Sequence, residues 1–346
     1  MPASATSRDA SLLDLRPDLD DPVARTATWA AAALDAGLLD LPLPGRGATG
    51  ERLAGLADLG TVDLDLARLA EAHADAAAIR ADLGFDGPDD GLWGVWAANP
   101  PADPLLARQQ GAGWVLEGTK PWCSGAGCCN RALVTARTAD GYRLFAVDLA
   151  EPRATPVDGT WPAAAMRGSD SRSVCFEVVP AEPVGGPEEY LHRPGFWHGA
   201  VGVAAVWWGG ARGVARALAR ADERRPLNPH ALAHAGAVDA SLAAGWASLA
   251  AAAAFFDGDP DDKTGLTRLT AGRVRAIVEA SAVEVVDRTG RALGAAPLAL
   301  DADHGRRVAD LGLYLRQSHA ERDLEELGRA SLDAGGFPWT TPDGPA

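Results

Sequence analysis

One segment of the chain combines a planar aromatic side chain, a hydroxyl group and glycine-flanked backbone. It runs from Gly113 to Gly127 and reads Gly-Trp-Val-Leu-Glu-Gly-Thr-Lys-Pro-Trp-Cys-Ser-Gly-Ala-Gly. Trp122 offers a flat indole, and Ser124 places a hydroxyl two residues later. Such a surface can stack on a planar heterocycle and form a hydrogen bond with its edge. The alternative is an ordinary hairpin with a half-buried tryptophan, and the motif alone does not separate the two.

Other reactive side chains lack the spacing that common catalytic or metal sites need. The chain has four cysteines: Cys123, Cys128, Cys129 and Cys175. None forms a Cys-x-x-Cys pair, and His230 and His234 have no third ligand nearby, so we expect no metal site. No Gly-x-Gly-x-x-Gly follows a strand, which argues against a Rossmann domain. No Gly-x-Ser-x-Gly frames Ser124, which argues against a serine hydrolase.

Charge and hydropathy exclude two classes of partner. The 346 residues carry 32 Lys+Arg and 47 Asp+Glu, a formal net charge of −15. A surface this acidic repels nucleic-acid phosphates and anionic lipids. The apolar stretches Ser241–Phe256 and Phe196–Gly210 are shorter than the roughly 20 residues of a spanning helix, so they are interpreted as buried helices. We expect a cytoplasmic protein with reduced thiols that binds neither nucleic acid nor membrane.

Three segments of different periodicity must position the candidate residues. From about 21 to 81 apolar residues recur at helical spacing, and from about 92 to 180 short β-branched and aromatic runs alternate with turn residues. The second pattern is typical of an antiparallel barrel or sandwich. Four long alanine-rich stretches then predict a helical bundle. These stretches are Ala200–Asp222, His230–Phe256, Thr267–Leu293 and Asp303–Leu327.

The tryptophan segment resembles the middle-domain signature of the acyl-CoA dehydrogenase family, Gly-x-Lys-x-Trp-Ile-Thr/Ser. Four residues match it: Gly118, Lys120, Trp122 and Ser124. Ala97–Pro100 stands where the family has a Thr-Glu-Pro turn, and Met166–Pro180 where it has Gly-x-Arg-x-Ser before a strand. Gly209–Arg216 resembles the start of the first C-terminal helix. The matches follow the family's order over about residues 20–330.

This resemblance implies an α+β fold with the acyl-CoA dehydrogenase-like arrangement. It comprises an N-terminal helical domain over residues 1–91, shorter than the family's, and a central antiparallel β-barrel over 92–185. A C-terminal four-helix bundle follows over 186–332, and a loose tail over 333–346.

The resemblance also implies FAD held between the barrel and the bundle. From the matching positions, the resemblance implies that Trp122 flanks the isoalloxazine, that Ser124 bonds near its N5 edge, and that Cys123 lies between them. Ala98 and Asn99 lie along the pyrimidine side through their backbone. The loop after Asn99 departs from the family's Gly-Ser-Asp continuation.

The residues that bind the flavin phosphates in the family are less well matched in this sequence. The family's Arg-x-x-Phe-Gly, which reaches the FAD pyrophosphate across a subunit interface, is echoed here only by Arg224 and Arg225. An arginine offers a fork of donors suited to phosphate, but the aromatic residue and the glycine are absent. The alternative is two solvated arginines at a helix end.

The catalytic base depends on the register of the last helix. Aligning Asp310 with the family's Arg-Asp places the base position at 317–319, where His319 is the nearest proton carrier and Asp323 could orient it from the same helical face. Aligning Arg316 instead places Glu325 on the base. We prefer the first register, and the alternative is a solvated charged helix face.

The expected function is therefore dehydrogenation of an acyl thioester, in which a base takes the α-proton and a hydride passes to flavin N5. A first alternative is a monooxygenase of the same superfamily that uses FMN or reduced flavin supplied by a reductase, together with oxygen. A second is a catalytically degenerate binding subunit. The resemblance implies a homo-oligomer in each case.

Overall fold

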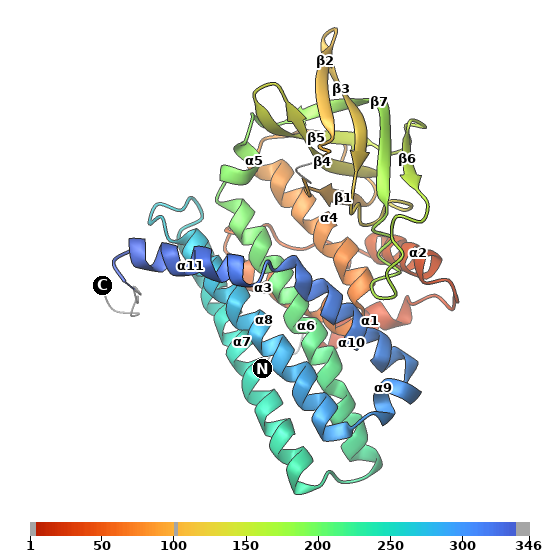
Figure 1. Ribbon diagram of the computed structural model, residues 1–346, viewed down its shortest axis with the longest axis vertical. Coiled ribbons are helices and arrows are strands. Elements are labelled where there is room, and N and C mark those ends of the chain that lie inside the picture. Colours follow the sequence, from red (N-terminus) through yellow and green to blue (C-terminus); the bar gives the residue numbers. More distant parts are fainter. Residues whose placement is uncertain (1–4, 100–102, 337–346) are drawn as a thin grey trace.

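The computed structural model describes residues 5–99 and 103–336. Pro100 of the expected turn and residues 337–346 of the expected tail lie outside this range. Helices form the lower body in Figure 1, and the strands form a cap above one end of them. The chain enters through four helices, which are α1 (Ala5–Asp14), α2 (Pro22–Asp35), α3 (Thr49–Val62) and α4 (Leu64–Asp82).

Helices α3 and α4 are buried along most of their length because they lie between other elements. Asp63 ends α3 and starts α4, where its carboxylate accepts the N–H groups of Asp65 (3.0 Å) and Leu66 (3.1 Å), a normal N-cap. A Cβ on Gly209 of α6 (Gly195–Arg224) would collide with the carbonyl of Ala57 on α3. Glycine therefore lets α3 and α6 approach closely.

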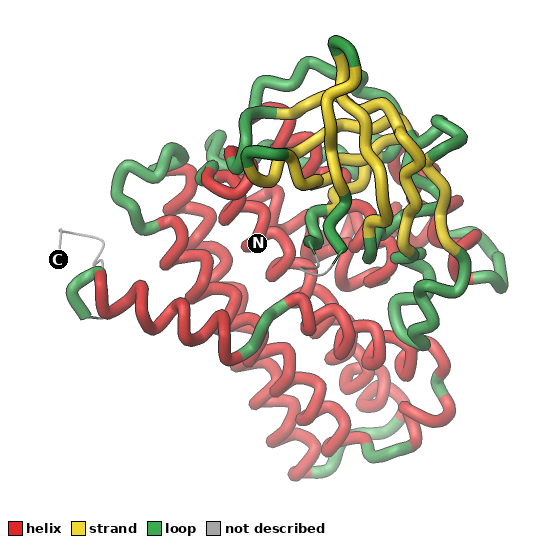
Figure 2. Tube along the Cα trace, turned by 45° about the horizontal axis from the view of Figure 1, so that its top comes forward, coloured by secondary structure: helices red, strands yellow, loops and turns green. Residues whose placement is uncertain are grey.

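Strands β2, β3, β7, β5 and β4 close into a ring, because β4 pairs with β5 along one edge and with β2 along the other. The strands are β1 (Trp93–Trp96), β2 (Leu106–Gln110), β3 (Gly113–Lys120), β4 (Arg131–Thr138), β5 (Gly141–Asp148), β6 (Ala154–Val157) and β7 (Ser173–Val184). Figure 2 shows how the strands cross over one another. The predicted barrel is confirmed, but it is not wholly antiparallel: β1 and β2 both run parallel to β4.

Three long helices form the C-terminal bundle with a shorter fourth. They are α6 (Gly195–Arg224), α7 (Pro229–Gly258) and α8 (Thr267–Leu293), preceded by the short α5 (Glu189–His192). The helix expected over Asp303–Leu327 is interrupted. It consists of α10 (Ala302–Tyr314), a 3-10 turn η1 (Leu315–Gln317) and α11 (Glu321–Asp333), which follow the short α9 (Ala296–Leu300).

Helix α7 is less buried than the sequence suggested. It is long and apolar enough to cross a membrane by length and composition, yet only 28% of its most apolar window is buried inside the chain. The prediction of a buried helix over Ser241–Phe256 is therefore wrong in part. One side of α7 packs on α8 through residues such as Leu249 and Phe256, and the other presents exposed alanines.

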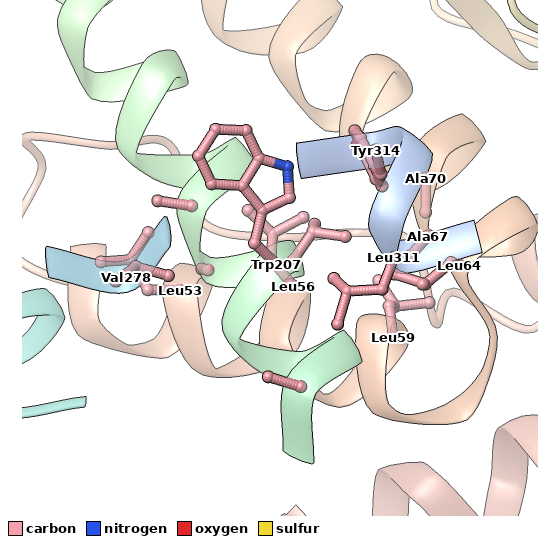
Figure 3. Close-up of a cluster of buried hydrophobic side chains, with 14 of the residues drawn as sticks. Leu53, Leu56, Leu59, Leu64, Ala67, Ala70, Trp207, Val278, Leu311 and Tyr314 are labelled. Atoms are coloured by element: carbon pink, nitrogen blue, oxygen red, sulfur yellow. The ribbon is translucent and has the colours of Figure 1, made fainter. Parts of the chain in front are cut away.

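The main core joins the N-terminal helices to the bundle. Figure 3 shows the indole of Trp207 from α6 among Leu53 and Leu56 of α3, with Leu311 and Tyr314 of α10 nearby. All five side chains are at most 3% exposed. Because α3, α4, α6, α8 and α10 share this core, the N-terminal helices and the bundle form one packed body.

Two backbone-to-carboxylate bonds dock the barrel on the helices. The loop between β6 and β7 donates the N–H of Met166 to Asp310 (2.6 Å) and the N–H of Ser169 to Asp65 (3.0 Å). Arg306 binds the same carboxylates, at 2.9 Å from Asp310 and 3.7 Å from Asp65, and lies 2.8 Å from Asp63. Three buried carboxylates around one guanidinium leave an excess of negative charge.

This excess predicts a pH-dependent stability. Burial, followed by the charges of Asp63 and Asp310, raises the pKa of Asp65 to about 8. The folded state therefore binds this proton more tightly than the unfolded chain does. Protonation of Asp65 therefore stabilises the folded state. This contribution is complete below about pH 4 and is lost as the pH rises through about 8. In urea denaturation, Asp65→Asn should have little effect at pH 4 and should stabilise the protein at pH 9. Asp86→Asn, in an exposed loop, is the control, and an equal effect of Asp65→Asn at both pH values would contradict the prediction.

Candidate functional site

The turn after β3 exposes a large indole. The Trp122 side chain is 61% exposed, and its backbone has φ 57°, a left-handed conformation that is unfavourable for a bulky residue. Three hydrogen bonds hold the turn: Cys123 N–H to Arg172 O (2.9 Å), Gly125 N–H to Ser169 O (2.8 Å) and Trp96 Nε1–H to Ser124 O (3.0 Å). The surrounding structure thus imposes a strained conformation that presents a flat apolar surface.

The two residues that follow Trp122 point elsewhere. The thiol of Cys123 is fully buried in the barrel and donates to Lys120 O (3.2 Å), and burial raises its pKa. Only its backbone could meet a ligand. Ser124 is 5% exposed, and its hydroxyl lies 2.8 Å from that of Ser171. A hydroxyl chain continues from Ser171 Oγ to Ser169 Oγ (2.9 Å) and from there to Met166 O (2.7 Å).

Lys120 anchors the edge of this site from inside the barrel. Its ammonium donates to Asn99 Oδ1 (2.9 Å), Thr135 O (2.6 Å) and Thr135 Oγ1 (2.8 Å), which uses all three of its N–H groups. Burial lowers the pKa of Lys120 to about 7. The side chain of Asn99 is thereby fixed inward, and the backbone groups of Ala98 and Asn99 have no hydrogen-bond partner among the described residues.

Replacing Lys120 should destabilise the protein. Lys120→Met keeps the apolar stem but removes the three hydrogen bonds to Asn99 Oδ1, Thr135 O and Thr135 Oγ1 and leaves Asn99 Oδ1 only the donation from Thr135 Oγ1 (2.9 Å), which costs about 2 kcal/mol. We expect a lower denaturation midpoint in urea at pH 7. The chain's other lysine, Lys263, is 79% exposed, and Lys263→Met should leave the midpoint unchanged. Equal midpoints for the two variants would refute this role of Lys120.

A groove of about 370 Å³ lies between the start of α6, α8 and the segment from η1 into α11. Its lining includes His319, the aromatic residues Phe196 and Trp197, and three arginines, Arg268, Arg275 and Arg322. The guanidinium of Arg268 lies 5.4 Å from the ring centre of Trp197, and that of Arg275 lies 4.6 Å from the ring centre of Trp207. The groove therefore combines aromatic walls, positive charge and an imidazole.

His319 lies in the break between η1 and α11. Its ring Nδ1 is 3.1 Å from Asp323 Oδ1, and its backbone N–H donates to Asp323 Oδ2 (3.0 Å). The two residues meet as expected, but not on one helical face: His319 precedes α11, and Ala320 turns the chain with φ 51°. Among the described residues Nε2 of His319 has no hydrogen-bond partner, so this nitrogen is available to a ligand.

The remaining sequence candidates lie outside this groove. Glu325 forms an ion pair with Arg329 on the exposed side of α11 and does not line the groove. Arg224 and Arg225 are exposed at the α6–α7 turn, at the end of the bundle away from the barrel (Figure 1). In this chain they do not meet Trp122.

A buried charged cluster beside the groove escaped the sequence analysis. Arg68 pairs with Glu71 on α4, and burial raises the pKa of Glu71 to about 7. Several buried polar atoms of the cluster have no hydrogen-bond partner among the described residues. They include Arg52 Nε, Arg68 Nε, Asp75 Oδ1, Trp207 Nε1 and Tyr314 Oη. Buried polar atoms normally have partners, so this interior is suited to water or to polar groups of a ligand. The signal in the sequence was the spacing of Arg68, Glu71 and Asp75 on one face of an alanine-rich helix.

These features fit a flavin. The exposed indole can stack on its rings, the same turn carries the hydroxyl of Ser124, and the buried charged cluster offers unpartnered polar atoms. The barrel between N-terminal helices and a C-terminal bundle is the acyl-CoA dehydrogenase-like fold. The predicted fold is thereby confirmed over the whole described chain.

Solved structures with this fold match the chain from end to end. Dibenzothiophene monooxygenase TdsC of Paenibacillus sp. A11-2, in a complex with FMN and indole, is 20% identical, covers 98% of each chain and gives a TM-score of 0.81. Methanesulfinate monooxygenase MsuC of Pseudomonas fluorescens is 19% identical over 99% of each chain, with a TM-score of 0.80. A variant of the Tcur3481–Tcur3483 steroid ACAD is 19% identical over 96% of this chain and 97% of that one, with a TM-score of 0.75. No protein-family model and no curated protein matches the sequence.

Proposed function

We propose that this protein is a flavin-dependent monooxygenase that uses reduced FMN and oxygen, with His319 as its proton-transferring group. The observation that carries the proposal is the His319–Asp323 pair in the groove, where the sequence lacks the family's glutamate base. The carboxylates that line the groove are already paired: Glu279 with Arg316, Glu326 with Arg268, and Asp323 with His319. Each groove carboxylate thus has a partner, whereas Nε2 of His319 has none among the described residues.

The solved structures with this fold also support a monooxygenase. TdsC and MsuC are described as monooxygenases, and the TdsC complex holds FMN. This revises our sequence-based preference for an FAD-dependent dehydrogenase. The absence of a full Arg-x-x-Phe-Gly segment is consistent with a flavin that lacks the adenylate half. Reduced flavin would supply two electrons, which place one oxygen atom in the product and the other in water.

In this proposal each part of the site has a defined task. Trp122 stacks on the flavin, Ser124 bonds to its edge, and the aromatic walls and arginines of the groove bind a small planar or anionic substrate. Asp323 fixes the orientation of the His319 imidazole, which can then move a proton at Nε2.

The test is oxygen incorporation. Protein mixed anaerobically with photoreduced FMN is exposed to ¹⁸O₂ with indole, dibenzothiophene or methanesulfinate, and the products are analysed by mass spectrometry. One ¹⁸O atom per product is expected. Enoyl thioester formed from acyl-CoA with an artificial electron acceptor would instead support the dehydrogenase. A chain that binds no flavin in either redox state would be a binding subunit.

We also propose that the protein is a homo-oligomer assembled through α7. The exposed alanines recur at spacings of three and four along one side of this helix, at positions 240, 244, 247, 251 and 254. Small side chains at this spacing let a second helix pack closely. Such packing would cover the part of α7 that the chain itself leaves exposed. Light scattering after size-exclusion chromatography should give a mass above that of one chain, and a monomer would refute the proposal.

A further inference from the structure

We infer that the buried serine chain makes Ser124 a hydrogen-bond acceptor, so that the site selects reduced flavin over oxidised flavin. This inference rests on the proposed function, which places a flavin N5 edge at Ser124. It goes further by assigning to Ser169 and Ser171 the role of positioning residues that set the redox preference of the site.

The donor-to-acceptor direction along this chain of serine hydroxyls is fixed at its inner end. A carbonyl oxygen only accepts hydrogen bonds, so the hydroxyl of Ser169, 2.7 Å from Met166 O, must direct its single proton there. The same carbonyl accepts Trp161 Nε1–H (3.0 Å). Both lone pairs of Met166 O are therefore engaged, and Ser169 has only lone pairs left for its other neighbour.

The remaining directions follow in sequence. Because Ser169 cannot donate to Ser171, Ser171 must donate to Ser169 across 2.9 Å. Its only proton is then used, so Ser124 must donate to Ser171 across 2.8 Å. Ser124 retains lone pairs alone for a ligand. The three side chains are 1%, 6% and 5% exposed for Ser169, Ser171 and Ser124, which leaves little room for water to reverse the order.

The loop that carries the chain is held rigidly. Met166 and Asp170 both have positive φ values, 52° and 43°. The Met166 and Ser169 N–H groups bind Asp310 and Asp65 on the helices, and the Asp170 carboxylate accepts Gly127 N–H at 2.8 Å. A strained loop persists only when its surroundings over-determine it. The carbonyl that sets the chain direction is thus fixed in place.

An acceptor at this position distinguishes the two redox states of flavin. Reduced flavin carries a hydrogen on N5 and can donate it to Ser124, whereas N5 of oxidised flavin has only a lone pair. To bind the oxidised form, Ser124 must turn its proton away from Ser171 and lose one buried hydrogen bond. The net value of such a bond corresponds to about a tenfold difference in affinity. For a two-electron couple, tenfold tighter binding of the reduced form raises the flavin potential by about 30 mV.

The experiment measures dissociation constants of oxidised FMN and anaerobically photoreduced FMN for the full-length protein. We expect the wild type to bind the reduced form about tenfold more tightly, with the matching rise in midpoint potential. In Ser169→Ala, Ser171 is free to donate to Ser124, which can then donate to oxidised N5. The ratio of the two constants should fall to about one, mainly because the oxidised form binds more tightly.

Controls separate this inference from a general loss of structure and from failure of the proposed function. Ser171→Ala should also abolish the preference, and it provides the test if Ser169→Ala does not fold. Ser169→Thr keeps the hydroxyl and should restore the ratio. Ser248→Ala removes a remote serine whose hydroxyl donates to Gly245 O on α7, and should change nothing. Equal constants in the wild type, or an unchanged ratio in Ser169→Ala, would overturn the inference and leave the flavin function standing. No binding of either form would overturn both.

Discussion

Replacing His319 with glutamine should lower the rate of product formation by about 100-fold to 10,000-fold, the usual contribution of a positioned acid or base. Glutamine can still form a hydrogen bond in the groove, but it cannot carry a proton. His319 is on the surface of the break before α11, and its only described side-chain bond is to Asp323. The fold should therefore be unaffected. The measurement is kcat with the substrate found by oxygen incorporation.

Two neighbours make this prediction specific. Asp323→Asn keeps the side-chain shape but removes the charge that orients the imidazole, and we expect a smaller loss of about tenfold to 100-fold. Glu325→Gln alters a carboxylate that pairs with Arg329 outside the groove and should retain full activity. Loss of activity in Glu325→Gln with retention in His319→Gln would reverse the assignment of the base. Affinity for reduced FMN should be unchanged in all three variants.

Replacing Trp122 with glycine should weaken flavin binding while leaving the protein as stable as before, or up to about 1 kcal/mol more stable. Glycine adopts the left-handed conformation of this residue without steric cost. The indole contributes little to the core because it is 61% exposed. Removing its stacking surface should raise the dissociation constant for FMN by about tenfold to 100-fold.

A loss of flavin affinity without a loss of stability would distinguish a binding role of Trp122 from a role in folding. A tryptophan retained for folding would give a variant that is both less stable and weaker in binding. Trp122→Phe keeps an aromatic ring and should recover most of the affinity with wild-type stability. Trp114→Phe changes a partly buried indole that packs on Phe145 of the barrel, 5.4 Å between ring centres, and should affect stability more than flavin binding. A loss of stability in Trp122→Gly without loss of affinity would remove Trp122 from the proposed site.

The architecture could be predicted because the hydrophobic period changes along the chain, and because the tryptophan motif stands at its expected place in the barrel. The break at Gln317–Ala320 in the expected last helix could not be predicted from the sequence. No proline or glycine marks it, and the residues around it favour a continuous helix. The break depends on tertiary contacts, such as the Arg275 donation to Gln317 O at 3.4 Å, and on local bonds such as Ser318 Oγ with Ala320 N–H at 3.2 Å.

The sequence also could not indicate which side of a helix is buried when its sides have the same composition. Alanine surrounds α7 on every side, so periodicity could not indicate which side packs on α8 and which stays exposed. On α4 the reverse holds. Charged residues three and four positions apart usually form a solvated helix face, but Arg68, Glu71 and Asp75 are enclosed because both α3 and α6 pack on this helix. The serine chain depends on a loop whose path is set by contacts with Asp65 and Asp310, which are distant in sequence.

The burial of Lys120 has a practical consequence for labelling. Amine-directed reagents need a deprotonated amine that they can reach. Lys120 is 1% exposed inside the barrel, so its low pKa does not make it reactive. Because the chain has only two lysines, such reagents should modify a single side chain, Lys263, in the loop between α7 and α8, besides the terminal amine. A dye placed there would report, by energy transfer between copies, how the chains associate.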